Sequence, residues 1–359
     1  MKILTIIGAR PQFIKAAVIS HEISKHDELN EVMVHTGQHF DNNMSNIFFE
    51  EMNLPKPKYH LDINSLGHGA MTGRMLEGIE NILVEEKPDW VMVYGDTNST
   101  IAGALAARKK HIKVAHVEAG LRSFNMNMPE EINRILTDRI SNVLFCASKS
   151  GIDNLKVEGF DNFDIDVRYT GDVMFDAVKF YSDRLEATNE IVSNLPEDFI
   201  LATLHREENT NDLIALKVLI ESLNYINKNI MPVVIPIHPR TKKILEENNL
   251  NLDAIMIEPV GYLDMLSLLR QSKLIITDSG GLQKEAYFCK KPCVTMRNET
   301  EWTELVDYGY NIIAGNKSFD KIIESVNLGF NIDMKIAKMD IYGEGNAGTI
   351  IVDYFLNSI

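Results

Sequence analysis

The sequence predicts an α/β protein made of two doubly wound, Rossmann-like domains, each built on a mainly parallel sheet. Short apolar runs alternate with longer amphipathic stretches along the whole chain, which is typical of βα units. The alternation occurs twice, on either side of a weak boundary near 171–198 that contains the polar stretch YSDRLEATNEIVSNLPED. The length of 359 residues also suits two domains, at roughly 150 residues per domain.

The first half of the chain contains the apolar runs of one sheet. Strands are expected at 2–7, 31–36, 89–95, 112–118 and 142–147, with a short further strand at 167–171. Helices are expected at 13–26 and 72–87. The second of these ends before Pro88, because proline disfavours helix in the residue that precedes it.

The second half repeats the pattern. Strands are expected at 199–205, 231–238, 254–259, 273–279, 292–297 and 311–315, and helices at 212–229, 262–272 and 281–290. The chain ends in an amphipathic stretch that could pack on the first half. We therefore expect a first domain of 1–172 completed by a C-terminal helix at about 345–359, and a second domain of 173–344. Ligands of such folds bind at the carboxyl ends of the strands, here in the cleft between domains.

Composition excludes several classes of function. The formal net charge of −15 makes the chain a poor binder of nucleic acid or of an anionic membrane. The apolar runs are too short to cross a bilayer, and the apolar N-terminus is too short for a signal peptide, so a cytoplasmic protein is expected. Three cysteines without a convincing set of metal-binding partners are interpreted as buried thiols in a reducing compartment, and no metal site is expected.

Charged residues follow several expected strands of the first half. Arg10 and Lys15 lie at the start of a helix, where the N-terminus already favours anions. Asp96 and Glu118 each fall at the end of a strand, and Glu130 opens a helix. Carboxylates that converge favour proton uptake and therefore acid–base chemistry. Each residue also has a structural interpretation, as a solvated cation, a turn residue or a first-turn acid.

The second half offers a phosphate-binding pattern. The strand expected at 273–279 leads into Ser279, Gly280 and Gly281 at a helix start, where backbone N–H groups without Cβ atoms nearby suit a diphosphate. Glu285 lies about one turn into that helix, where it could accept hydrogen bonds from ribose hydroxyls. A tight βα turn with small residues is the alternative.

Three further polar residues follow strands of this half. His205 is a candidate acid or base, Arg206 a candidate phosphate contact, and His238 falls at the next strand end. Structural roles for both histidines remain open. The chain contains neither a GxGxxG fingerprint nor a Walker motif, so dinucleotide binding and ATP hydrolysis are unsupported. Together the strand-end groups indicate a nucleoside diphosphate ligand with acid–base chemistry on its substituent.

Seven motifs in order resemble those of the non-hydrolysing UDP-N-acetylglucosamine 2-epimerases, which share the two-domain GT-B fold. They extend over most of the chain, up to YGEGNA at 342–347, and are GARPQFIK (8–15), GDTNST (95–100), HVEAGLRS (116–123), PEEINR (129–134), HREEN (205–209), TDSGGLQKEA (277–286) and MRNETE (296–301).

The resemblance implies a mechanism that inverts C2 of a UDP-sugar. A base removes the C2 hydrogen while UDP leaves C1, which gives 2-acetamidoglucal, and UDP then adds back after protonation on the other face. By motif, Asp96, Glu118 and Glu130 would be the acid–base carboxylates, assisted by His205. The resemblance also implies no redox cofactor, a homodimer, and a place in the synthesis of surface polysaccharide precursors.

The diphosphate and ribose contacts are implied by motif as well. Arg10 and Lys15 would stabilise the departing diphosphate, Ser279 and Gly280 would hold phosphate, and Glu285 would hold ribose.

The chain departs from the common family pattern in three places. Where the family usually has GTRPE-x-IK, this chain has Ala9, Gln12 and Phe13. Where the family usually has TERPE, this chain has TEWTE at 300–304, with Trp302 in place of arginine. An activator site usual in this family keeps Gln38 and His39 but lacks the second glutamine. These features resemble the subgroup acting on UDP-2,3-diacetamido-2,3-dideoxy-glucuronate, for whose carboxylate Arg122 and Arg297 are candidate partners.

The exact sugar therefore stays open, and so do three other activities. A GT-B glycosyltransferase would need an acceptor, a UDP-sugar sensor would bind without exchange, and a hydrolysing epimerase would release free ManNAc.

Overall fold

The computed structural model describes residues 1–38, 49, 51–52, 54–182, 185, 193–336, 338 and 340–359. The chain forms two compact units. Unit 1 comprises Met1–Lys179 with Met339–Ile359, and unit 2 comprises Phe180–Lys338. The chain passes from unit 1 to unit 2 within helix α7 (Val173–Ser182), a few residues beyond the boundary expected at 172.

Unit 1 is built on a parallel sheet with the strand order β3-β2-β1-β4-β5-β6-β7. All of the paired strands run parallel. The strands are β1 (Lys2–Ile7), β2 (Asn30–His35), β3 (Tyr59–His60), β4 (Trp90–Tyr94), β5 (Lys113–Ala119), β6 (Val143–Cys146) and β7 (Asp166–Tyr169). Strands β1 and β4 are almost wholly buried, as expected for a parallel sheet covered on both faces.

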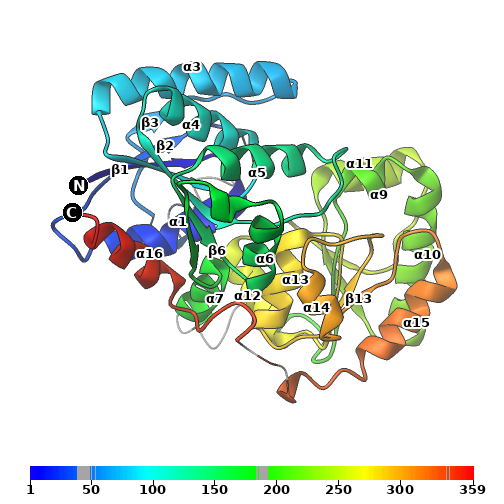
Figure 1. Cartoon of the computed structure of the whole chain (residues 1–359). Helices are drawn as coiled ribbons and strands as arrows, with labels where there is room; N and C mark the ends of the chain where they lie inside the picture. Colours follow the sequence, from blue (N-terminus) through cyan, green and yellow to red (C-terminus); the bar gives the residue numbers. More distant parts are fainter. Residues whose placement is uncertain are drawn as a thin grey trace. The chain divides into compact units, whose positions relative to one another are not determined.

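Helices cover both faces of this sheet (Figure 1). Helices α3 and α4 pack together on one face, and α16 lies beside α1 on the other. The carboxylate of Asp176 accepts hydrogen bonds from the N–H groups of Ala347 (3.1 Å) and Gly348 (2.8 Å), so the buried start of α16 is satisfied. The helices of this unit are α1 (Arg10–Ile23), α3 (His68–Glu86), α4 (Asn98–Lys109), α5 (Pro129–Ile140), α6 (Lys149–Val157), the start of α7, α16 (Ala347–Leu356) and the short η1 (Phe160–Asn162).

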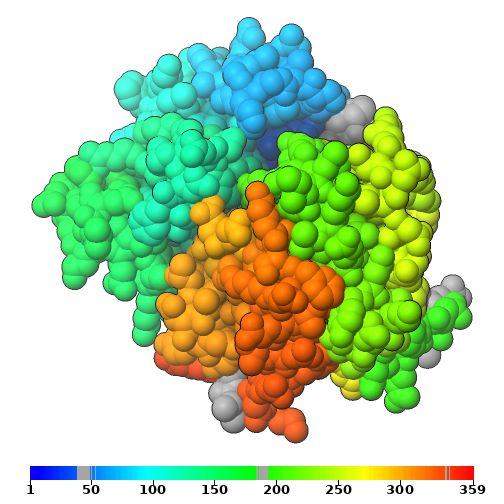
Figure 2. Space-filling view, turned by 90° about the vertical axis from the view of Figure 1, so that its right-hand side faces the viewer, coloured from blue at the N-terminus to red at the C-terminus, as the bar shows by residue number. Residues whose placement is uncertain are grey.

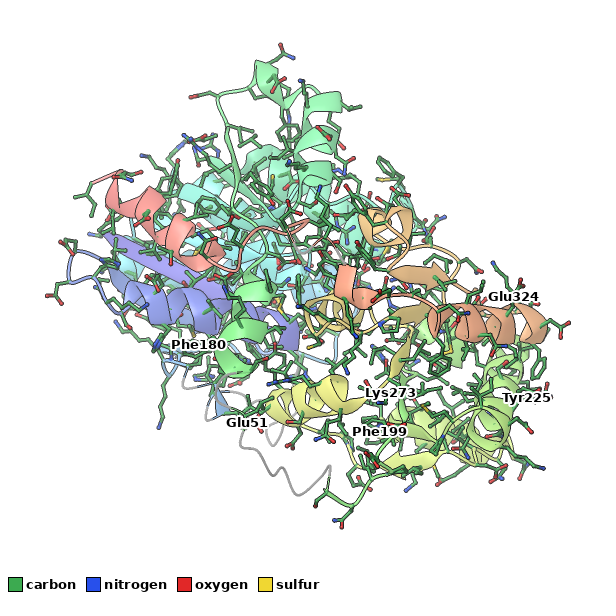
Figure 3. The ribbon with its side chains drawn as sticks, turned by 90° about the horizontal axis from the view of Figure 1, so that it is seen from below. Glu51, Phe180, Phe199, Tyr225, Lys273 and Glu324 are labelled. Carbon is green, nitrogen blue, oxygen red and sulfur yellow. The ribbon has the colours of Figure 1, made fainter. Side chains whose placement is uncertain are left out.

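Unit 2 is built on a second parallel sheet with the order β10-β9-β8-β11-β12-β13. Phe199 and Lys273, which Figure 3 labels, stand at the amino ends of β8 and β11, and the N–H of Lys273 donates to the carbonyl of Phe199 at 2.8 Å. The strands are β8 (Ile200–Thr203), β9 (Val233–Pro236), β10 (Ile255–Ile257), β11 (Leu274–Thr277), β12 (Cys293–Thr295) and β13 (Asn311–Ile313).

The helices of unit 2 pack through regular apolar stripes. Asp212 caps α10, whose buried side chains recur every three or four residues from Ala215 to Ile226. Helices α10 and α15 lie side by side on the face that Figure 2 shows, in green and orange, and the rings of Tyr225 and Phe319 are 5.4 Å apart. The helices are α9 (Glu207–Thr210), α10 (Leu213–Asn229), α11 (Pro239–Glu247), α12 (Tyr262–Gln271), α13 (Gly280–Phe288), α14 (Thr303–Asp307), α15 (Phe319–Gly329) and the short η2 (Met334–Ile336).

The fold class expected from sequence is confirmed, with two doubly wound parallel sheets. Every expected strand is present, with ends displaced by one to a few residues. The sequence did not reveal β3, because a two-residue edge strand has no apolar pattern. Helix α1 begins at Arg10 rather than at 13, since Pro11 suits a first helical turn.

Each sheet has one topological switch point, where neighbouring strands connect in opposite directions. In unit 1 it lies between β1 and β4, and in unit 2 between β8 and β11. Ligands of open α/β sheets bind at the carboxyl ends of such strand pairs. The segments at these ends begin at Gly8 and Gly95 in unit 1, and at Leu204 and Asp278 in unit 2.

Candidate active site

The two loops at the switch point of unit 1 are joined by one buried side chain, Gln12. Its Oε1 accepts from the N–H groups of Gly8 (2.8 Å) and Ala9 (3.0 Å). Its Nε2 donates to the carbonyl of Tyr94 (2.7 Å) and to Thr97 Oγ1 (3.0 Å). Glutamine serves here because one amide accepts from one loop and donates to the other, which an ionised carboxylate cannot do.

Gly8 allows this loop to close against its neighbours. A Cβ at this position would lie 2.1 Å from Thr36 Oγ1 and 2.2 Å from Ser99 Oγ, so only glycine fits. The two hydroxyls are 2.8 Å apart, and Ser99 also donates to Gln38 Oε1 at 2.8 Å from its hydroxyl and 3.1 Å from its N–H. His39, the other residue of the activator site considered from sequence, lies outside the described residues.

Lys15 and Glu118 form a buried ion pair beside the β4–α4 turn. Their side chains are 8% and 10% exposed. An ideal Cβ on Gly95 would lie 3.4 Å from Glu118 Oε2 and 3.8 Å from Lys15 Nζ, so the pair lies directly against this turn. Two residues predicted on separate motifs are thus in contact.

Glu118 itself has an unusual backbone. Its φ of +68° lies in the left-handed region, which is costly for residues other than glycine. The register between β5 and β6 shifts between Val117 and Ala119, so Glu118 occupies a bulge at the end of its strand. Bulges commonly redirect a side chain at the edge of a sheet, and this one places the carboxylate against Lys15.

Asp96 follows Gly95, whose φ is +60°, and its carboxylate pairs with Arg134 of helix α5. Asn133 of the same helix donates to the carbonyl of Asp96 at 2.9 Å. Arg134 also pairs with buried Glu131 at 2.8 Å, which in turn accepts from the N–H groups at 123 and 124. The start of α5 is therefore fixed against the Asp96 turn.

Arg10 and Glu130 are less enclosed. Arg10 is the first residue of α1 and is half-buried. Glu130, in the first turn of α5, is half-buried as well and makes no ion pair with the described residues, whereas its neighbour Glu131 is wholly buried. The structure thus places Glu130 on the helix that contacts Asp96 and leaves its carboxylate available.

Asp278 organises the switch point of unit 2. This wholly buried carboxylate accepts from the N–H groups of His205 (3.0 Å) and Arg206 (2.9 Å) and from Asn209 Nδ2 (3.2 Å). It also contacts His205 Nδ1 at 3.1 Å. Burial works to raise the pKa of Asp278, but the His205 side chain and these backbone donors outweigh it and leave the pKa below its ordinary value.

Helix α13 presents its N-terminus beside charged side chains. Ser279 is its N-cap residue, and Gly281 has open space where a Cβ would stand. A Cβ on Gly280 would lie 2.4 Å from Glu301 Oε1 and 3.8 Å from Arg206 Nη2, so a carboxylate and a guanidinium both lie at this helix start. An acid favours this position because the helix dipole attracts anions.

Glu301 is itself held by Arg297, whose Nη1 lies 3.1 Å from Glu301 Oε2. Arg297 is buried, and its Nε has no hydrogen-bond partner among the described residues. Trp302, which replaces the usual arginine, donates from its indole Nε1 to the carbonyl of Gly280 at 2.9 Å, and Lys284 Nζ lies 3.9 Å from the centre of the Trp302 ring. The tryptophan at this position therefore stabilises the start of α13 through the hydrogen bond of its indole.

The remaining predicted residues differ in their surroundings. Glu285 is buried in α13, 7% exposed, whereas His205 is exposed at the end of β8. His238 is exposed and accepts from the N–H of Arg240 at 3.2 Å, so it caps α11. This contact supports the structural interpretation of His238. His238 still lies at the carboxyl end of β9, the neighbour of β8.

Sequence reasoning missed the residues that hold these groups in place. Gln12, Arg134, Asp278 and Glu301 all lie inside the motifs, but their roles depend on side-chain partners from other loops. A usable signal was that each is polar and lies within four residues of a predicted site residue or strand end. Arg122 was a candidate for a sugar carboxylate, but its guanidinium is already paired with Asp138 and Glu158.

The three cysteines are not suited to nucleophilic chemistry. Burial raises the pKa of the Cys289 and Cys293 thiols to about 12 and that of Cys146 still further. Over the described ranges, no cluster of histidine, cysteine and carboxylate side chains could hold a metal ion. In the same part of the chain, no helix combines the length and the apolar character that a membrane crossing requires.

Comparison with known proteins gives a consistent result. Residues 21–356 match the family described as UDP-N-acetylglucosamine 2-epimerase. A UDP-2,3-diacetamido-2,3-dideoxy-D-glucuronate 2-epimerase from Pseudomonas aeruginosa is 55% identical over 356 residues, 99% of each chain. A UDP-N-acetylglucosamine 2-epimerase from Methanocaldococcus jannaschii is 44% identical over 365 residues, 98% of each chain.

Solved structures agree with the sequence matches. The crystal structure of the Methanocaldococcus jannaschii UDP-GlcNAc 2-epimerase in complex with UDP-GlcNAc and UDP has a TM-score of 0.92 at 43% identity, and covers 99% of this chain and 100% of that one. The Neisseria meningitidis enzyme bound to UDP-GlcNAc has a TM-score of 0.89 at 31% identity, with 99% and 100% covered.

Proposed function

Because the chain belongs to the UDP-N-acetylglucosamine 2-epimerase family, we propose that it is an isomerase that interconverts UDP-GlcNAc and UDP-ManNAc without net hydrolysis. The observation that carries this proposal is the charge arrangement at the two switch points. Unit 1 gathers carboxylates and cations there, and unit 2 presents a helix N-terminus beside a guanidinium. The first set suits acid–base chemistry on a sugar, and the second suits the phosphates of UDP.

The reaction has two half-steps. In the first, a carboxylate takes the C2 proton, the C1–O bond to the diphosphate breaks with both electrons leaving on UDP, and 2-acetamidoglucal forms. In the second, a proton is delivered to the other face of C2 and UDP re-forms its bond to C1. Carbon 2 changes configuration, and no electron is gained or lost overall.

Glu118, Asp96 and Glu130 are the proposed acid–base carboxylates. The backbone strain at Glu118 supports a functional role, because left-handed conformations of such residues cluster at active sites. Asp96 and Glu118 flank the same Gly95 turn, and Glu130 stands on the helix that contacts Asp96. Proton transfer by positioned carboxylates typically contributes about 100- to 10,000-fold to a rate.

Lys15 has two proposed partners in turn. Without ligand its ammonium is held by Glu118, and an adjacent cation opposes protonation of that carboxylate. A bound diphosphate would compete for Lys15 and so leave Glu118 a better base. Arg10, at the start of the same helix, is the proposed second cation for the leaving diphosphate.

Unit 2 supplies the proposed nucleotide contacts. Phosphate oxygens would accept from the Ser279 hydroxyl and from the N–H groups of Gly280 and Gly281, with Arg206 beside them, since the N–H of Ser279 already donates to Thr277 Oγ1 at 2.9 Å. Glu285 is the proposed ribose ligand and His205 the proposed assisting acid or base; His238 is kept as a weaker substrate contact, given its capping role.

A second candidate substrate is UDP-2,3-diacetamido-2,3-dideoxy-glucuronate. The 55% identity to an enzyme with that name favours it, and so does Trp302 in place of arginine. Its sugar carboxylate needs a cation. Arg122 is already bound by two carboxylates, so Arg297, with one unpartnered nitrogen among the described residues, is the better candidate.

The test follows the C2 hydrogen. Purified protein is incubated in D2O with each sugar separately, and deuterium at C2 and the epimer are followed by proton NMR. Exchange at C2 with accumulation of the epimer and without an acceptor is expected for one sugar or both. Binding of UDP without exchange would favour a sensor, a need for an acceptor would favour a glycosyltransferase, and free ManNAc would indicate a hydrolysing enzyme.

The control for this assay is Glu80→Gln. Glu80 is a surface carboxylate on α3 that forms an exposed ion pair with Lys110. The substitution should leave the exchange rate unchanged. Absence of exchange with both sugars in the unmodified protein would refute the proposed reaction.

Three further expectations rest on the family resemblance. We propose a homodimer, a cytoplasmic location and a role in supplying surface polysaccharide precursors. Light scattering on a gel-filtration column tests the first, and cell fractionation tests the second.

A further inference from the structure

His116 lies wholly buried beneath the loops of the candidate active site, two residues before Glu118 on strand β5. Its Nε2 lies 2.7 Å from the carbonyl oxygen of Gly95, and its Nδ1 lies 2.7 Å from Asp138 Oδ1. A carbonyl oxygen only accepts, so Nε2 is the donor in the first contact. The ring therefore bridges the β4–α4 turn to helix α5.

Asp138 extends this bridge to the next loop. Its Oδ2 accepts from the N–H of Gly120 (3.2 Å) and from Arg122 Nη1 (2.7 Å), and Arg122 also donates to the carbonyl of Leu121 at 2.6 Å. The four side chains His116, Asp138, Arg122 and Glu158, the last bound to Arg122 at 2.7 Å, form one network. The network is hydrogen-bonded to the backbone of two loops near Glu118. One contact is the carbonyl of Gly95 in the β4–α4 turn, and the others are Gly120 and Leu121, which follow Glu118 in the chain.

The Gly95 turn is where this network meets the proposed chemistry. Gly95 has a φ of +60°, and its N–H donates to the carbonyl of Val117 at 3.0 Å, next to Glu118. The Lys15–Glu118 pair lies against Gly95, and Asp96 follows it directly. A displaced Gly95 carbonyl would shift both carboxylates relative to C2 of a bound sugar.

We propose that His116 is a positioning residue, which sets the distance between Asp96 and Glu118 by holding the Gly95 carbonyl. The proposal rests on the proposed function, since those carboxylates are the groups that need a fixed spacing. Active sites lose about 100-fold in rate for misplacements on the order of 1 Å. Binding of UDP should be less affected, because the proposed nucleotide contacts belong to unit 2.

Two conservative substitutions separate positioning from general stability. The side-chain amide of His116→Gln can occupy the place of Nε2 and donate to Gly95, but it loses Asp138. The amide of His116→Asn occupies the place of Nδ1 and keeps Asp138, but it does not reach Gly95. Each variant loses one buried hydrogen bond and some ring volume, so the loss of stability alone does not distinguish them.

The expected result is asymmetric. His116→Asn should lower kcat for C2 exchange about 10- to 100-fold with KM changed less than about 3-fold, whereas His116→Gln should keep kcat within about 5-fold. Equal loss in both variants, or a loss confined to KM, would overturn the proposal. The unmodified protein in the same assay reports separately on the proposed function, because it shows no exchange if that function is wrong.

Two measurements do not depend on turnover. Hydrogen–deuterium exchange should become faster for backbone amides at 95–97 in His116→Asn but not in His116→Gln. If neither variant folds, nitrogen-15 NMR of the unmodified protein should show a slowly exchanging proton on His116 Nε2. An unprotonated Nε2 could not donate to the Gly95 carbonyl and would contradict the proposal.

Discussion

Replacing Asp278 tests whether one buried carboxylate holds the two motif segments of unit 2 together. In Asp278→Ala, the N–H groups of His205 and Arg206 and the amide of Asn209 lose their acceptor. A buried donor without a partner costs about 1–3 kcal/mol. Because His205 is partly exposed and water can reach it, we expect the free energy of unfolding of unit 2 to fall by about 3–5 kcal/mol. Asp278→Asn keeps one acceptor oxygen and should lose about half as much.

The two tryptophans allow unit 2 to be followed by itself. Trp90 belongs to unit 1 and Trp302 to unit 2, and both are buried. In a Trp90→Phe background, fluorescence during urea denaturation therefore reports the surroundings of Trp302. Glu208→Ala is the matched control, since this exposed carboxylate of the same motif makes no hydrogen bond or ion pair with the described residues and should leave the midpoint unchanged.

The pH dependence gives a second, independent check. The pKa of Asp278 is lower in the folded protein than in the unfolded chain, so its ionised form stabilises the fold above the unfolded pKa near 4. That stabilisation is lost as the pH falls through the folded value. The difference in stability between the unmodified protein and Asp278→Ala should therefore be full at pH 7 and shrink below about pH 4. A loss under about 1 kcal/mol at pH 7, or a difference independent of pH, would refute this account of Asp278.

Four other substitutions have defined outcomes. Asp96→Asn and Glu118→Gln should each slow C2 exchange about 100- to 10,000-fold while UDP affinity, measured by calorimetry, stays within about 3-fold. If a variant loses both exchange and UDP binding, the residue has a structural role instead. Glu285→Ala should weaken UDP binding about 10-fold or more while kcat changes less, and unchanged affinity would remove it from the ribose site. Gly120→Ala should destabilise unit 1 by about 2–4 kcal/mol in thermal unfolding, because its φ is +80° and a Cβ would lie 2.4 Å from the carbonyl oxygen of Gly151; a stability change near zero would contradict the geometry.

The strands, and the polar residues that stand at their carboxyl ends, could be predicted because both depend on local sequence. A parallel strand buried on both faces gives a continuous apolar run, such as WVMVY in β4, and a polar residue directly after it marks the carboxyl edge of the sheet. The edge strand β3 lacks such a run, and the start of α3 at His68 precedes its apolar pattern, so neither boundary was visible.

The partners of the site residues could not be predicted, because they depend on which loops the sheet order brings together. Lys15 meets Glu118 only because β1 and β5 both flank β4. Gln12 joins two loops that are more than eighty residues apart along the chain. Glu130 and Glu131 show the same limit, since adjacent acids in one helical turn differ only in the direction in which they point, and Glu131 points to Arg134.

These partners also explain how a chain with a net charge of −15 can serve an anionic ligand. At the switch points Lys15, Arg134 and Arg297 are each matched with a carboxylate, which offsets the cost of holding cations in largely buried places. Direct attraction between close charges outweighs the long-range repulsion from a net charge that salt screens beyond about 10 Å. When a diphosphate arrives, a cation at the site exchanges its carboxylate partner for a phosphate. In the proposed reaction that exchange is useful, because a phosphate that takes over Lys15 removes a cation that opposes protonation of Glu118, so removal of the C2 proton is favoured when UDP is in place to leave.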